Sequence, residues 1–125
     1  MSEASVEQTA WDKIPLEKVA DGMHRRIVTG EKMTVARIYF EDGFRVPQHS
    51  HEHEQISQVI KGTLRFWFGA EREGPIDFGP GEVVVIPPHV PHEALSIGEV
   101  EEMDMWSPRR DDWLDGTDDY LRGGE

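Results

Sequence analysis

Short alternating runs of apolar and polar residues, each followed by a turn, restrict the fold of this chain more than any other feature. Glycine- and proline-rich turns separate the runs, which cover residues 23–30, 33–40, 56–60, 63–69, 76–79, 82–87, 92–97 and 99–106. Many short strands with regularly spaced turns are typical of a sandwich or barrel. We therefore predict an all-β barrel over residues 23–107, with an N-terminal arm (1–22) and a C-terminal tail (108–125) of loop or short helix.

Size and composition narrow the class of protein. A chain of 125 residues with 37% hydrophobic and 30% charged residues is expected to form one globular domain. No apolar run approaches the roughly 20 residues needed to cross a bilayer. The N-terminus lacks the basic start and apolar stretch of a signal peptide. We therefore expect a cytoplasmic protein with no membrane partner.

The net charge and the cysteine content exclude further kinds of partner and of covalent or metal-binding chemistry. The net charge of −12 argues against nucleic acid and anionic lipid surfaces as partners. This charge does not fix the sign of an internal site, since an acidic exterior can enclose a locally positive pocket. The absence of cysteine excludes disulfides and thiolate metal ligands.

Most of the histidines fall in one part of the sequence, between His49 and His92. Imidazole nitrogen is the commonest metal ligand near neutral pH. His49, His51 and Gln55 have the spacing HxHxxxQ, and residues two and four apart on a strand share a face. Together with His92 they predict a metal site of three imidazoles and one amide oxygen. This set suits one divalent transition metal per chain: nickel, iron, manganese, zinc or cobalt.

The spacing around these histidines resembles the first motif of the cupin superfamily, G(X)5HXH(X)3,4E(X)6G. Gly43, His49, His51, Gln55 and Gly62 match every interval of that motif. Gln55 stands where most cupins have glutamate. With only neutral ligands, a divalent metal would keep its full positive charge, which favours anionic, oxygen-rich substrates.

A second stretch resembles the second cupin motif, G(X)5PXG(X)2H(X)3N. Gly81, Pro87, His89, His92 and Ser96 keep its spacing, with His89 in place of glycine and Ser96 in place of asparagine. Histidine is among the residues found more often at positive φ, so we expect His89 to make the turn. The resemblance implies a double-stranded β-helix, or jelly-roll, barrel around a metal centre.

The end of the barrel resembles that of small single-domain cupins that include the pectin-degradation cupins. Asp104, Trp106 and Arg110 match the pattern D-x-aromatic-S-P-x-R of that group, with tryptophan where phenylalanine is expected. The resemblance implies a small-molecule substrate, an unsaturated uronate whose ring is opened. It also implies a homodimer, and an outward Trp67 beside Arg65 would suit a subunit interface.

Roles for these residues follow from their positions. Asp104 and Trp106 are two apart and share a strand face, so Asp104 is the expected proton shuttle if that face lines the cavity. We expect Arg110 to fold over the mouth and bind a substrate carboxylate with two hydrogen bonds. The size of Trp106 would shape the pocket.

Other interpretations of the same residues stay open. The histidines could bind a ligand directly without metal, and Gln55 could bond backbone groups instead. Asp104 could be an ordinary polar residue, and Arg110 could belong to a surface cluster of salt bridges. His53 suits a position behind the ligands or in solvent, and His89 suits the rim.

Three functions are compatible with this pattern. The first is an enzyme that isomerises a small acidic, oxygenated substrate or opens its ring, without redox change. The second is a metal-dependent dioxygenase of an aromatic or diketone-like substrate, with Trp106, Phe66 and Phe68 as the floor of its pocket; the neutral Gln55 argues against it. The third is a non-catalytic cupin that binds a small molecule or shapes a polyketide.

Overall fold

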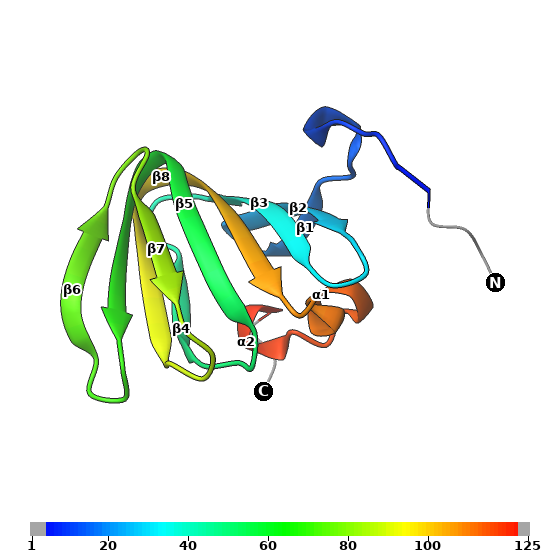
Figure 1. Cartoon of the computed structure of the whole chain (residues 1–125). Helices are drawn as coiled ribbons and strands as arrows, with labels where there is room; N and C mark the ends of the chain where they lie inside the picture. Colours follow the sequence, from blue (N-terminus) through cyan, green and yellow to red (C-terminus); the bar gives the residue numbers. More distant parts are fainter. Residues whose placement is uncertain (1–4, 123–125) are drawn as a thin grey trace.

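The computed structural model describes residues 5–122, so the ends of the predicted arm (1–4) and tail (123–125) lie outside the described residues. The chain forms β-strands with a few short helices (Figure 1). The elements are a 3-10 helix η1 (Trp11–Lys13), β1 (Glu17–Ala20), β2 (Met23–Thr29), β3 (Thr34–Phe40), β4 (Arg45–His49), β5 (Glu54–Phe68), β6 (Glu73–Phe78), β7 (Val83–Ile86), β8 (His92–Ser107), α1 (Asp111–Asp115) and α2 (Asp119–Arg122). None of the described helices is long and apolar enough to cross a membrane.

Two long strands, β5 and β8, run through both layers of the barrel (Figure 1). The first half of β5 pairs with the second half of β8, and the second half of β5 pairs with the first half of β8. One layer therefore has the order β1-β2-β3-β8-β5-β7, and the other has the order β4-β8-β5-β6. All pairs are antiparallel, which confirms the predicted all-β barrel.

Gly62 lies where β5 bends from one layer to the other. Its φ is +83°, and a Cβ atom there would lie 2.1 Å from the carbonyl oxygen of Glu99. Only glycine fits such a close approach of two backbones. The sequence predicted separate strands over residues 56–60 and 63–69, and over 92–97 and 99–106, whereas each pair of runs forms one strand, β5 or β8. The pairing with β8 continues through the bend, with register shifts on both sides of Lys61.

Alternate residues of β8 point into the barrel, as the predicted strand parity requires. Val100, Glu102, Asp104 and Trp106 are all buried, with at most 4% of each exposed. Register places Asp104 beside Ser57 of β5, within the same layer. The inner surface of this layer is therefore polar at several positions beside the apolar core.

The outer face of β5 carries Trp67, while Phe66 is buried inside the barrel at 3% exposure. The guanidinium groups of Arg45 and Arg72 lie 5.3 and 4.8 Å from the centre of the Trp67 ring. Both arginines also pair with Glu93, so the chain itself covers part of the indole. The subunit interface predicted here stays a prediction.

The N-terminal arm is shorter than the sequence indicated. Residues Glu17–Ala20 are not part of an arm, because they form β1 and pair with β2. Upstream of β1, the ring of Trp11 lies 5.7 Å from the guanidinium of Arg37. Figure 1 shows the segment before η1 extending away from the barrel.

The C-terminal tail folds back onto the barrel beside β1 and β4 (Figure 1). Asp118, between α1 and α2, binds the fully buried Arg25 of β2. Glu17 of β1 binds both Arg25 and Arg122. Trp113 of α1 packs into the core, so the predicted loop and short helix close one side of the interior.

Candidate metal centre and cavity

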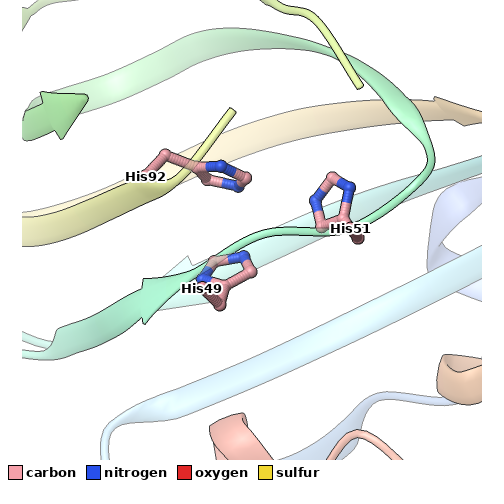
Figure 2. A group of neighbouring side chains, drawn as sticks. All are labelled: His49, His51 and His92. Carbon is pink, nitrogen blue, oxygen red and sulfur yellow. The ribbon is translucent and has the colours of Figure 1, made fainter. Parts of the chain in front are cut away.

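Three histidines from separate parts of the chain surround one point, as Figure 2 shows. His49 ends β4, His51 follows in the next loop, and His92 begins β8 directly opposite His49 in the strand register. One nitrogen from each ring lies within 4.8 Å of the others, so this cluster could hold a metal ion. The strand pairing of β4 with β8 therefore joins the two sequence motifs.

The second nitrogen of each ring fixes the direction of the first. Nδ1 of His49 lies 2.9 Å from the Pro47 carbonyl, and Nδ1 of His92 lies 2.9 Å from the Val90 carbonyl. Nδ1 of His51 lies 3.0 Å from the carbonyl of His53. A carbonyl only accepts, so each Nδ1 must carry the proton and each Nε2 presents a lone pair. Metal-binding histidines typically show this arrangement.

Burial keeps the imidazoles neutral. It lowers the pKa of His49 to about 3 and the pKa of His51 to about 4. Burial also lowers the pKa of His92, and the positive charge of Arg110 acts in the same direction. Nε2 of His92 is buried and has no hydrogen-bond partner among the described residues. A buried lone pair without a donor is a costly arrangement that a cation would relieve.

Gln55 faces the same cluster. Its Oε1 lies 3.1 Å from Nε2 of His51 and accepts a 2.8 Å hydrogen bond from Nε1 of Trp106. Its Nε2 donates a hydrogen bond to Oγ of Ser57 at 2.9 Å. Two lone-pair atoms, Oε1 of Gln55 and Nε2 of His51, thus approach each other closely. The donor set of three imidazoles and one amide oxygen fits a divalent first-row metal. The role of Gln55 as a fourth ligand stays a prediction.

The remaining histidines of the two motifs lie outside the cluster. His53 is partly buried, its ring centre lies 5.3 Å from that of His51, and its carbonyl accepts the His51 hydrogen bond. His89 is exposed and has a φ of +67°, so it makes the turn that a glycine would otherwise make. Its backbone N–H donates to the carbonyl of His51 at 2.8 Å, which ties the two motif loops together.

Ser96 stabilises the turn that precedes the first motif. Its Oγ donates to the Glu41 carbonyl at 2.6 Å and accepts from the Phe44 N–H at 2.8 Å. The backbone carbonyl of Ser96 also accepts from the N–H of Gly43. The residue that replaces asparagine in the second motif therefore holds the loop that leads into β4.

A small cavity of about 40 Å³ lies between the histidines and the tail. Metal-cluster residues, core residues and tail residues share its wall. They are Met23, Ile38, Phe40, Val46, His49, Gln55, Phe66, His92, Ala94, Glu102, Asp104, Trp106, Arg110, Trp113, Tyr120 and Leu121. The predicted set of Asp104, Trp106 and Arg110 thus lies on the same cavity as His49 and His92.

Arg110 lies inside the protein, not over an open mouth. Only 1% of it is exposed. Its guanidinium packs beside the pair of indoles formed by Trp106 and Trp113, 5.1 and 5.0 Å from their ring centres. Nε and Nη2 donate to the carboxylate of Asp112, and Nη2 also donates to the Tyr120 hydroxyl. Nη1 makes no hydrogen bond within residues 5–122, so it is the nitrogen left for an anionic ligand. The location predicted for this side chain was wrong.

Two titratable residues on the cavity wall, Glu102 and Tyr120, were missed by the sequence reasoning. Glu102 has the same strand parity as Asp104 and Trp106, and that parity was a usable signal. Tyr120 of α2 stacks on the ring of His49 with 4.4 Å between ring centres. No local pattern indicated Tyr120, since the tail reaches the metal cluster only through its docking on the barrel.

Comparison with known protein families identifies the family of this chain. A cupin domain model matches residues 36–106, which is more than half of the sequence. The match spans both histidine motifs and ends at Trp106. The chain therefore belongs to the cupin family, as the motif spacing predicted. A comparison with curated protein sequences gave no match.

Solved structures show the same fold. KdgF from Halomonas sp. has a TM-score of 0.80 and 26% identity, over 88% of this chain and 100% of that protein. An RmlC-like cupin from Shewanella frigidimarina NCIMB 400 has a TM-score of 0.76 and 24% identity, over 87% of this chain and 96% of that protein. A cupin superfamily protein from Desulfitobacterium hafniense DCB-2 has a TM-score of 0.63 and 17% identity, over 71% of this chain and 80% of that protein.

Proposed function

We propose that this cupin is a metal-dependent enzyme that opens the ring of a small unsaturated uronate. One observation carries the proposal: Asp104 and Arg110 line the same cavity as His49 and His92. The pattern of Asp104, Trp106 and Arg110 resembles that of pectin-degradation cupins, with tryptophan where phenylalanine is expected. The similarity to KdgF, a cupin of pectin degradation, supports the same activity.

The charges of the cavity suit an anionic substrate. The three imidazoles are neutral. Arg110, which is paired with Asp112, adds a cationic side chain to the cavity wall of a protein whose net charge is −12. A divalent metal held by His49, His51 and His92, with Gln55, would act as a Lewis acid on a substrate oxygen. Nη1 of Arg110 can bind a substrate carboxylate, and the neighbouring indoles hold the guanidinium in place.

The proposed reaction balances without an oxidant. The bond between the anomeric carbon and the ring oxygen breaks, and the anomeric hydroxyl loses its proton. The enolate that results takes up one proton on carbon and becomes a linear keto acid, so the composition of the substrate does not change. Asp104 is placed to carry this proton, since it is buried on the cavity wall and one of its oxygens has no partner among the described residues.

The test is turnover of an unsaturated galacturonate monomer by the metal-loaded protein, followed by NMR. Asp104→Asn should reduce turnover by roughly a hundredfold or more, with metal content unchanged. Arg110→Lys should raise KM, whereas Arg109→Lys, a matched change at an exposed neighbour, should leave it unchanged.

Two results would contradict the proposal. Oxygen uptake with an aromatic or diketone-like substrate, and no uronate turnover, would favour the dioxygenase. Uronate binding to the metal-loaded protein with no change in the ligand would favour a non-catalytic binding cupin.

A further inference from the structure

A second carboxyl group lies next to Asp104 inside the barrel. Glu102 is 4% exposed, two residues before Asp104 on β8, and lines the same cavity. Its neighbours in the strand register are Val59 of β5 and Ile38 of β3, which are both apolar and buried. A buried carboxyl group between apolar neighbours costs free energy that leucine at this position would avoid. Such a group therefore points to a role other than packing.

The two carboxyl groups are two residues apart on the buried face of β8 and line one cavity, and each influences the pKa of the other. Ser57 lies opposite Asp104 in the strand register. Oε1 of Glu102 and Oδ1 of Asp104 are buried and have no donor among the described residues. Two ionised carboxylates are acceptors only, so this geometry is unfavourable unless one of them keeps a proton.

The surroundings decide which carboxyl group keeps the proton. Burial raises the pKa of Asp104, but the nearby Glu102 and Ser57 side chains and the positive charge of Arg110 act in the opposite direction and favour its ionised form. The other buried arginine, Arg25, is already paired with Glu17 and Asp118. Burial, with the charge of Asp104, raises the pKa of Glu102 well above its usual value. The other titratable groups on the cavity wall are His49, His92 and Tyr120.

We propose that Glu102 is a positioning residue that remains protonated and donates a hydrogen bond to the ionised Asp104. This bond orients the Asp104 carboxylate on the cavity wall and limits the cost of burying its charge. An effect of Glu102 on catalysis rests on the function proposed above. The proton shared by Glu102 and Asp104 does not depend on that function. Glu102 acts through Asp104 and need not touch the substrate.

The first test measures stability and needs no substrate. A carboxyl group whose pKa is raised on folding stabilises the protein below its unfolded pKa, roughly 4.3. That stability is lost as the pH rises through the folded pKa. Glu102→Gln removes this ionisation and keeps a donor for Asp104. The Tm of Glu102→Gln relative to the unmodified protein should therefore rise as the pH rises from 5 to 9. Infrared spectra at neutral pH should show a carboxylic acid C=O band that Glu102→Gln loses.

Glu101→Gln is the matched control, because Glu101 is the neighbouring glutamate on the partly exposed face of β8 and pairs with Arg37. Its Tm should not show the rise with pH, and its carboxylic acid band should stay. A Glu102→Gln protein whose Tm stays at a constant offset from pH 5 to 9, with an unchanged infrared spectrum, would overturn the proposal. It would show that Glu102 is ionised in the folded protein.

The second test concerns the link to Asp104. Glu102→Leu fills the space but donates no hydrogen bond, so the pKa of Asp104 should rise and the acidic limb of the kcat/KM profile should move to higher pH. Glu102→Gln should keep this limb near its original position, with metal content equal in all variants. An unshifted profile in Glu102→Leu would remove Glu102 from the mechanism. If the unmodified protein fails to turn over uronate, the function above is wrong, and the stability and infrared results still decide the protonation of Glu102.

Discussion

The indole N–H of Trp106 donates a 2.8 Å hydrogen bond to Oε1 of Gln55, the same oxygen that lies 3.1 Å from Nε2 of His51. The indole therefore fixes which end of the amide faces the metal cluster. Ser57 holds the other end of the amide by accepting from its Nε2. Aromatic residues without an N–H cannot supply this contact.

Replacement of this indole should weaken metal binding. Trp106→Phe removes the N–H donor, so the amide of Gln55 is free to turn, and we expect a several-fold loss of affinity for zinc or nickel. Competition with a chelator of known affinity measures this loss. Trp113→Phe, a matched change at the neighbouring cavity indole, should leave affinity near its original value. Equal affinity in Trp106→Phe would show that the bond does not position Gln55.

The three-histidine cluster predicts a stoichiometric metal. His51→Ala removes one of three converging nitrogens, so metal content measured by elemental analysis should fall from about one per chain toward zero. The protein must be purified without a metal-affinity tag. His53→Ala changes the adjacent histidine outside the cluster and should retain the metal. Absence of metal from the unmodified protein, even after reconstitution, would remove the Lewis acid from the proposed reaction.

Gly62 should be more sensitive to substitution than the other bend glycine. In Gly62→Ala the new Cβ would meet the Glu99 carbonyl oxygen at 2.1 Å, so the two backbones must separate. Gly98→Ala is the matched control, since Gly98 also has a positive φ, +75°, but nothing lies within 4 Å of its Cβ position. Gly98→Ala should cost roughly 1–2 kcal/mol of left-handed strain, and Gly62→Ala should cost clearly more. Chemical denaturation measures both, and equal losses would contradict the prediction.

Local sequence patterns predicted the parts of this fold that depend on local geometry. Strand parity placed Asp104 and Trp106 on the inner face, and motif spacing placed His89 in a turn at positive φ. The same parity applies to Glu102 and could have placed it at the cavity, although carboxyl groups are rarely buried.

Features that depend on distant contacts could not be predicted. Arg25 and Asp118 are 93 positions apart, and neither lies in a recognisable motif. Their pairing brings the tail onto the barrel, which places Tyr120 on His49 and seals Arg110 inside. The expected position of Arg110 was wrong for this reason, since sequence placed it after the last strand without showing what would cover it.

The Arg25–Asp118 pair should control the docking of the tail. Both side chains are fully buried, so Asp118→Asn leaves a buried guanidinium with a weaker partner and should cost roughly 3 kcal/mol. Hydrogen exchange over residues 111–122 should accelerate, because Trp113 and Leu121 lose their anchor on the barrel. Asp111→Asn breaks an exposed pair with Arg109 in the same tail and should cost less than about 1 kcal/mol. Unchanged exchange in Asp118→Asn would show that apolar packing alone holds the tail against the cavity.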